Sequence, residues 1–237
     1  MQKAIRIGII VAICGLFIGL ACYNSLNPAA PDMTAWNENM TLGDKETAKH
    51  HFVMYTDISC PFCSKFSDAL AANWDDFMKN YIEGKNIYFE IRMTDMNHVS
   101  GHSNNSRPAA EGAYCAAKQE KFWEFYHEIL AKLFEDYHSK GIGVSPTSEK
   151  IPDLEMSYFY DAADKAGVDH DKFVSCMEND ETTAEIDTNT TRASAVASGL
   201  PYFVFDKFTY NGFAGDWNTD VDYLTAKDML DVGLSTK

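Results

Sequence analysis

A closely spaced pair of cysteines between a β-type run and a helical pattern constrains the fold more than any other feature. Residues 51–56 read HFVMYT, which predicts a short strand, and Cys60 and Cys63 follow directly. Residues 86–93 read NIYFEIRM and predict a second strand. Between these strands, apolar residues recur at helical spacing: Phe66, Leu70, Trp74, Phe77 and Tyr81. This order predicts a strand–helix–strand unit with a right-handed crossover.

The remainder of the chain predicts that the same sheet is completed after a long helical segment. Patterns between about 97 and 198 are helical, and β character returns at 202–205 and 208–210. A closing helix is predicted over 223–232. No second sheet is visible, so we expect one α/β domain over 46–237 that carries a helical insertion.

Capping residues divide the insertion into separate helices. Asn105 or Ser106 is placed to cap the first helix, with Pro108 in its first turn. Gly167 is placed to end a later helix as its C′ glycine. Helical patterns cover 108–133, 154–166, 169–177 and 182–198.

The N-terminal residues have the order of a targeting segment. Lys3 and Arg6 precede an unbroken apolar run over 7–22, as in a secretory signal peptide or an N-terminal membrane anchor. We therefore expect 1–23 to be one of these two, followed by a linker over 24–45 that is rich in Asn, Pro and Ala. Either alternative places the domain outside the cytoplasm, in the periplasm or at the exterior of the cell envelope.

Charge and composition exclude some classes of partner. The formal net charge is −15, and a surface this acidic repels phosphate backbones, which argues against a nucleic-acid partner. Hydrophobic residues make up 46% of the chain and aromatic residues 13%, which is typical of a globular protein with a core.

The cysteine pair has the features of a redox centre. Cys60 would lie where free backbone N–H groups and the positive end of the helix dipole stabilise a thiolate. Pro61 suits the first helical turn because it lacks an N–H that would otherwise be unpaired. Phe62 adds no charge, and we expect it to shape the surroundings of the attacking sulfur. Cys63 would lie one turn inward and be buried.

Two other interpretations of these cysteines are weaker. A zinc site requires a second close pair, whereas Cys115 and Cys176 are isolated. A purely structural disulfide rarely joins two cysteines at such spacing on a helix start. His98 and His102 lie in a polar segment without nearby cysteines or carboxylates, so we expect a solvated loop and no metal site.

Further segments extend the similarity beyond the cysteine pair. Residues 57–63 read DISCPFC, residues 109–123 read AAEGAYCAAKQEKFW, residues 172–176 read KFVSC, and Pro201 precedes a β-run. In this combination, 46–237 resembles the DsbA-like branch of the thioredoxin superfamily. The resemblance implies a thioredoxin-like fold with a helical insertion.

The resemblance also assigns roles to individual residues. It implies a cis peptide bond between Leu200 and Pro201 facing the cysteines, with the Leu200 backbone placed to pair with an extended substrate. Asp57 is either a proton-transfer group or a strand-end carboxylate that faces water. Cys60 is implied as the exposed nucleophile and Cys63 as the resolving thiol. Leu200 departs from the family, in which Val or Thr is more usual, and this residue bears on the direction of the reaction.

The function implied by the resemblance is disulfide exchange in exported proteins. We expect an oxidase that introduces disulfides through the Cys60–Cys63 couple and needs no cofactor beyond this redox-active disulfide. Its substrates would be unfolded or thiol-bearing exported proteins, and a membrane oxidase of the DsbB or VKOR type would re-oxidise the monomeric enzyme. The alternatives are a reductase or isomerase of the same fold, or a peptide-binding chaperone without exchange activity.

Cys115 and Cys176 remain for a structural role. Some members of the family carry a second disulfide, and an exported domain with two cysteines left over favours pairing. The alternative is a pair of unrelated buried thiols, since free cysteine packs well in protein cores. We favour the bridge.

Overall fold

The computed structural model describes residues 38–179, 182–206, 208–212 and 223–235. The chain divides into two units at residues 32 and 33, and everything described below belongs to the second unit. The apolar segment predicted over 1–23 lies outside the described residues. Among the helices that are described, none has the length and apolar character needed to cross a membrane.

A five-stranded mixed sheet is the centre of the fold. The strands are β1 (Thr41–Leu42), β2 (His50–Thr56), β3 (Ile87–Met93), β4 (Tyr202–Phe205) and β5 (Phe208–Asn211). Their order across the sheet is β1-β3-β2-β4-β5. The β2–β3 pair is parallel, as expected from the strand–helix–strand pattern, and the other pairs are antiparallel.

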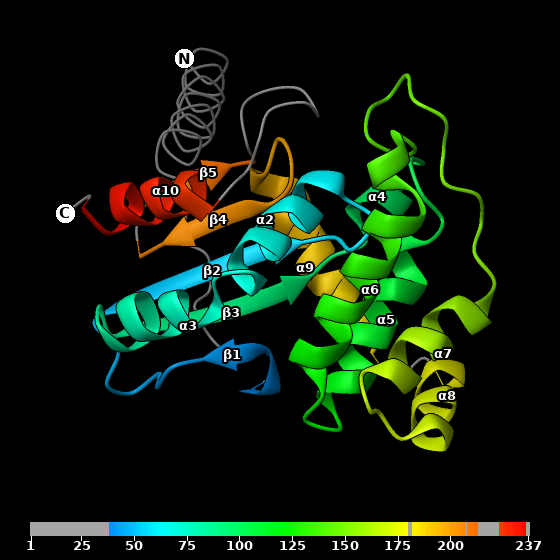
Figure 1. Cartoon of the computed structure of the whole chain (residues 1–237), viewed down its shortest axis with the longest axis horizontal. Coiled ribbons are helices and arrows are strands. Elements are labelled where there is room, and N and C mark those ends of the chain that lie inside the picture. Colours follow the sequence, from blue (N-terminus) through cyan, green and yellow to red (C-terminus); the bar gives the residue numbers. More distant parts are fainter. Residues whose placement is uncertain (1–37, 180–181, 207, 213–222, 236–237) are drawn as a thin grey trace, which may run out of the picture. The chain divides into compact units, whose positions relative to one another are not determined.

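Alternation along β2 separates two cores on opposite faces of the sheet. Phe52 and Met54 belong to the large core, whereas Val53 and Tyr55 belong to a smaller cluster. Helices α2 (Pro61–Ala71) and α10 (Tyr223–Ser235) contribute to the large core, and α9 (Thr183–Val196) covers the smaller one. Figure 1 shows α2 and α9 on opposite sides of the strands. Both faces are buried, which places the end of β2 deep in the protein.

The helical pattern predicted after the cysteines does not form one continuous helix. It divides into α2, α3 (Trp74–Phe77) and the π-helical segment η2 (Met78–Glu83). The break falls at Asn73, whose backbone leaves helical geometry with φ −127° and ψ 31°. The Asn73 side chain donates to the carbonyl of Ala69 at 3.0 Å, and such local bonding competes with helix continuation.

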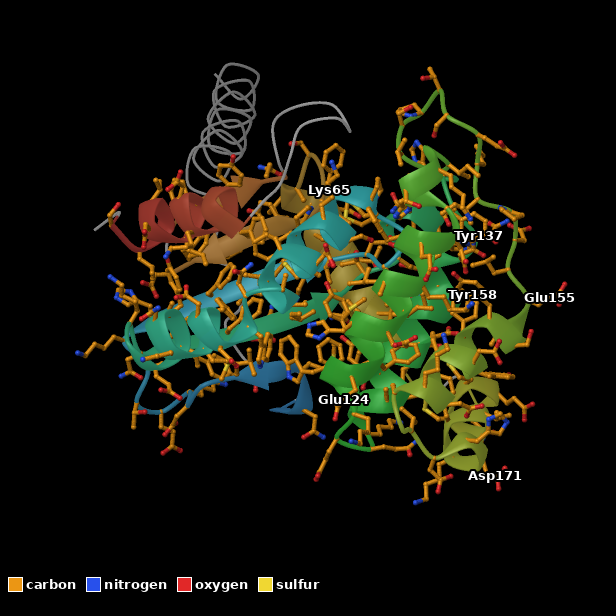
Figure 2. All side chains as sticks on the ribbon, viewed as in Figure 1. Lys65, Glu124, Tyr137, Glu155, Tyr158 and Asp171 are labelled. Carbon is orange, nitrogen blue, oxygen red and sulfur yellow. A yellow bond between two sulfur atoms is a disulfide. The ribbon has the colours of Figure 1, made fainter. Side chains whose placement is uncertain are left out.

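The predicted insertion is helical, as expected. It contains α4 (Met96–Val99), α5 (Ser106–Ala117), α6 (Phe122–Asp136), the short 3-10 helix η3 (His138–Lys140), α7 (Met156–Lys165), α8 (His170–Glu178) and α9. In Figure 1, α5 to α8 gather beyond the end of the sheet toward which β3 points. Tyr137, directly after α6, and Tyr158 of α7, both labelled in Figure 2, have ring centroids 6.4 Å apart. Gly167 follows α7 with φ +72°, as expected for a C′ glycine.

The N-cap predicted at Asn105 or Ser106 is confirmed in position at Asn105, but the expected side-chain capping bond does not form. Asn105 occupies the N-cap position of α5, but its side chain makes no capping hydrogen bond. Its amide instead donates to the carbonyl of Pro152 and accepts from the N–H of Leu154, which fixes the chain that precedes α7. The Ser106 hydroxyl donates to Asp57. Both side chains therefore serve long-range contacts in place of the local cap.

The linker predicted over 24–45 differs from the structure in its last part. Glu38–Met40 forms the 3-10 helix η1, and β1 follows it directly. Thr41 and Leu42 pair antiparallel with Glu90 and Phe89 of β3, and Met40 is buried in the core. An edge strand of two residues is too short to leave a periodic pattern in the sequence.

A disulfide joins Cys115 of α5 to Cys176 of α8, with the two Cα atoms 5.8 Å apart. The sequence left open either a bridge or two unrelated buried thiols, and the structure contains the bridge that we favoured. The bridge closes a loop with a sequence separation of 61 residues and holds two helices of the insertion together.

A buried ion pair lies on the α9 side of the sheet and was not predicted. The Arg92 guanidinium donates from Nε to Glu90 Oε1 at 2.8 Å and from Nη2 to Oε2 at 3.2 Å. It also donates to the hydroxyl of Tyr55 at 2.9 Å. Arg92 and Glu90 are both fully shielded from water, so each charge depends on the other.

Candidate active site

Cys60 occupies the N-cap position of α2, at the end of the turn that follows β2. Its backbone is extended, with φ −85° and ψ 119°, and Pro61 begins the helix as expected. The carbonyl of Cys60 accepts the first helical hydrogen bond, from the N–H of Ser64 at 3.1 Å. Cys60 was expected to be exposed, but it is only 7% exposed, because the loop that ends at Pro201 covers it.

Cys63 lies one turn further along α2 and is fully buried, as expected. Burial raises the pKa of the Cys63 thiol well above its ordinary value, and the neighbouring Cys60 acts in the same direction. The backbone N–H of Asp57 and the side-chain hydroxyl of Thr56 act in the opposite direction, toward a lower pKa. Cys60 and Cys63 are both free thiols in the structure, so Cys63 is a protonated thiol in a closed environment.

The Leu200–Pro201 peptide bond is cis, as the resemblance implied. Antiparallel pairing of β4 with β2 brings this segment against the cysteines. The Cys60 thiol donates to the carbonyl oxygen of Leu200 across an Sγ–O distance of 3.6 Å. Pro201 is buried, and its own carbonyl accepts from the N–H of Gly212 at 2.7 Å. The first cysteine therefore faces backbone atoms that lie 140 residues away in the sequence.

Asp57 is completely buried, so the alternative of a carboxylate facing water is wrong. Oδ1 accepts from the N–H of Ser59 at 2.9 Å and from the Ser106 hydroxyl, and Oδ2 accepts from the N–H of Asn97 at 2.9 Å. Burial raises the pKa of Asp57 to about 6, although these three hydrogen bonds act in the opposite direction. The carboxylate thus ties the cysteine turn to the first residues of α4 and α5.

A chain of buried hydroxyl groups lies beneath Cys63 and was not predicted. The hydroxyl of Tyr126, on α6, lies 3.3 Å from Thr56 Oγ1 and 2.8 Å from Ser67 Oγ. Thr56 is the last residue of β2, and Ser67 lies on α2. All three side chains are buried. No sequence pattern signals this cluster, because the three hydroxyls come from three separate elements.

A pocket of about 410 Å³ adjoins the cysteine turn. Its walls combine Pro61 and Phe62 with Gly199, just before the cis bond, and with the segment 143–151 of the insertion. Phe62 is half-buried at this position, and its expected role in shaping the surroundings of the sulfur stays a prediction. His102, which was expected in a solvated loop, is exposed but also lines the pocket.

Comparison with known proteins identifies the family and the fold. The family model described as Thioredoxin matches residues 36–203. No curated protein matches the chain.

Solved structures with a similar fold cover most of the chain. A thioredoxin-like oxidoreductase from Silicibacter pomeroyi superposes with a TM-score of 0.59 at 19% identity, covering 88% of this chain and 100% of that one. Oxidised BdbD from Bacillus subtilis gives 0.57 at 16% identity, covering 82% and 92%. DsbA from Chlamydia trachomatis gives 0.56 at 14% identity, covering 87% and 97%. At these identities the similarity shows a shared fold.

Proposed function

Because the chain belongs to the thioredoxin family, we propose that it is a thiol–disulfide oxidoreductase that introduces disulfides into exported proteins through the Cys60–Cys63 couple. The observation that carries this proposal is the position of Cys60. It is the N-cap of α2, Cys63 lies directly behind it, and the Leu200 carbonyl is 3.6 Å from its sulfur. A helix N-terminus stabilises the thiolate that disulfide exchange requires.

The proposed reaction transfers two electrons from a substrate dithiol to the enzyme disulfide. A substrate thiolate attacks Cys60, the Cys60–Cys63 bond breaks, and Cys63 leaves as a thiolate that takes up a proton. A second substrate thiolate then attacks the substrate sulfur of the mixed disulfide and releases Cys60. The substrate leaves with a disulfide and the enzyme becomes a dithiol. No cofactor beyond this disulfide is required.

Substrate contacts are proposed on both sides of Cys60. The Leu200 backbone would pair with an extended substrate segment, beside Pro201. On the other side, Phe62 and the pocket that it shares with 143–151 would hold an apolar side chain next to the substrate cysteine.

Asp57 is proposed to assist proton transfer during exchange. Its pKa of about 6 lies close to neutrality, so the carboxyl group can bind and release a proton under ordinary conditions. Its three hydrogen-bond donors also hold the cysteine turn in place.

The proposed location is outside the cytoplasm. The apolar segment 7–22 supports export, as a signal peptide or as a retained anchor. The Cys115–Cys176 bridge gives independent support, because structural disulfides persist mainly in oxidising compartments. The proposed substrates are unfolded or thiol-bearing exported proteins, and the proposed re-oxidant is a membrane oxidase of the DsbB or VKOR type. We propose that the enzyme works as a monomer and without nucleic acid.

Two experiments test the proposal. Cys60→Ser should abolish oxidation of a reduced, unfolded protein substrate, whereas Cys63→Ser should trap a mixed disulfide between Cys60 and the substrate. Full activity of Cys60→Ser would refute the assignment. The equilibrium between the protein and glutathione then decides the direction of exchange: a potential well above about −270 mV, the thioredoxin value, supports an oxidase. A potential at or below it indicates a reductase.

A further inference from the structure

The Cys63 sulfur is buried but must gain and lose a proton during disulfide exchange. Exchange in either direction changes the protonation of the Cys63 sulfur, because it is a thiol in the reduced enzyme and part of a disulfide in the oxidised enzyme. The side chain is fully buried, so bulk water does not reach its sulfur in this structure. The inference below rests on the proposed function, since it concerns the same cysteine couple.

Hydroxyl groups connect Cys63 to the interior of the α2–α6 interface. The Thr56 hydroxyl lies close enough to Cys63 to lower the pKa of its thiol. Thr56 Oγ1 lies 3.3 Å from the hydroxyl of Tyr126, which lies 2.8 Å from Ser67 Oγ. A hydroxyl group both donates and accepts, so each member can pass a proton to the next without a change of charge at rest.

The series of hydroxyls from Thr56 through Tyr126 ends at Ser67, which lies at a pocket that opens to solvent. Ser67 lines a pocket of about 110 Å³ between α2 and α6. Asp68, Ala131 and Phe134 also line it, and all three are exposed to solvent. His127 belongs to the same lining, next to Tyr126 in the sequence. The outer end of the hydroxyl series therefore lies at a solvent-exposed pocket that contains two titratable side chains, Asp68 and His127.

We propose that Thr56, Tyr126 and Ser67 form a proton relay that carries the proton of Cys63 between the buried sulfur and the solvent pocket on the α2–α6 surface. During ring closure from a glutathione mixed disulfide, the Cys63 sulfur attacks Cys60. The Cys60–glutathione bond breaks, its electron pair leaves with the glutathione sulfur, and the Cys63 proton moves through the three hydroxyls to the pocket. Ring opening by glutathione runs the same steps in reverse.

The surrounding titratable groups agree with this route. Burial, and then the electrostatic effect of the neighbouring Cys63, raise the pKa of Tyr126 above its ordinary value, which keeps the phenol protonated and able to relay. Burial lowers the pKa of His127, and the carboxylates of Glu124 and Asp68 oppose this shift. Asp57, proposed above to assist proton transfer, bonds to Ser59, Asn97 and Ser106, and none of these groups belongs to the relay. The hydroxyl that acts to lower the pKa of the Cys63 thiol is that of Thr56.

The test measures ring closure and ring opening of the Cys60–Cys63 disulfide in the full chain. The protein is trapped as a Cys60–glutathione mixed disulfide, and glutathione release is followed by rapid acid quenching. Opening of the oxidised protein by reduced glutathione is followed in the same way. Tyr126→Phe removes one relay hydroxyl and keeps the ring. A relay accelerates ring closure and ring opening equally. In Tyr126→Phe both rate constants should therefore fall by about tenfold or more, while the ratio of closure to opening stays within about twofold of the wild-type ratio.

Matched variants separate a relay from a disturbance of packing. Tyr114→Phe removes another buried phenol hydroxyl, which accepts a hydrogen bond from Asn189 at 2.7 Å and is not part of the relay. This variant should leave both rate constants unchanged. Ser67→Ala should reproduce the effect of Tyr126→Phe, and Ser67→Thr should restore the rates.

The outcomes distinguish this proposal from the proposed function. Unchanged rates in Tyr126→Phe and Ser67→Ala would overturn the relay and leave the oxidoreductase assignment intact. A changed ratio of the two rate constants would also overturn it, because the hydroxyls would then act on the equilibrium of the couple. If the unaltered protein cannot close its disulfide at all, the proposed function itself fails, and the relay fails with it.

Discussion

Replacing Asp57 with asparagine should change how the free energy of unfolding depends on pH. Asp57 is fully buried, and its pKa is raised from 3.8 to about 6. The folded state therefore binds the proton more tightly than the unfolded state does. Below pH 3.8 the group is protonated in both states and contributes nothing. As pH rises toward 6, the unfolded state ionises first and stability falls, and above pH 6 the full cost remains.

The size of this effect follows from the shift of about two pKa units. At about 1.4 kcal/mol for each unit, the ionised carboxylate costs the folded protein about 3 kcal/mol at neutral pH. Part of that cost is already present at pH 4, so the change between pH 4 and pH 7.5 is about 2.5 kcal/mol. Asparagine does not titrate, and it cannot accept all the hydrogen bonds that Asp57 accepts, which adds an offset that does not depend on pH.

The assay is urea unfolding of the reduced wild type and of Asp57→Asn between pH 4 and pH 7.5. The difference in unfolding free energy, variant minus wild type, cancels the titration of the other carboxylates. We expect this difference to increase by about 2.5 kcal/mol as pH rises, whatever its starting value. A difference that stays flat or decreases over this range would refute the burial argument for Asp57.

Three further substitutions test other parts of the fold. Cys115→Ala/Cys176→Ala should lower the free energy of urea unfolding by about 4 kcal/mol, because the bridge closes a loop of 61 residues, and a loss below about 1 kcal/mol would contradict this. Arg92→Met should cost about 3–5 kcal/mol in thermal unfolding, since Glu90 would remain charged and buried, and Glu90→Met in the same chain should recover most of the loss. Gly112→Ala should lower the free energy of urea unfolding by about 1–3 kcal/mol, because the added Cβ would lie 2.9 Å from the ring of Phe125 and 3.1 Å from that of Phe173. An unchanged urea midpoint would show that these rings can move aside.

Much of the fold was predictable from local patterns. The strands around the cysteine pair, the return to β structure after residue 201 and most helices of the insertion follow from periodicity and from the positions of glycine and proline. The Cys115–Cys176 bridge and the cis bond before Pro201 were expected from the resemblance, and both are present. The helix break at Asn73 was not expected, because a single side-chain hydrogen bond ends a pattern that is otherwise periodic.

The surroundings of the cysteines could be predicted only in part. The sequence identified Cys60 and Cys63, but it placed Cys60 in the open and left the position of Asp57 undecided. Burial of both depends on segments that pack over them from elsewhere in the chain, namely the loop that carries Leu200 and the first turn of α5. The hydroxyl chain through Tyr126 was missed for the same reason.

The sequence by itself determined the order of strands and helices and the placement of two cysteines at a helix start. These features depend on backbone preferences and on residues within a few positions of each other. Only the tertiary structure decided which groups surround the sulfurs. The contacts of Cys60 with Leu200, Thr56 with Tyr126 and Asp57 with Ser106 span 140, 70 and 49 residues. A single side chain at such a distance leaves no periodic signal, since its partner is set by how helices and strands pack.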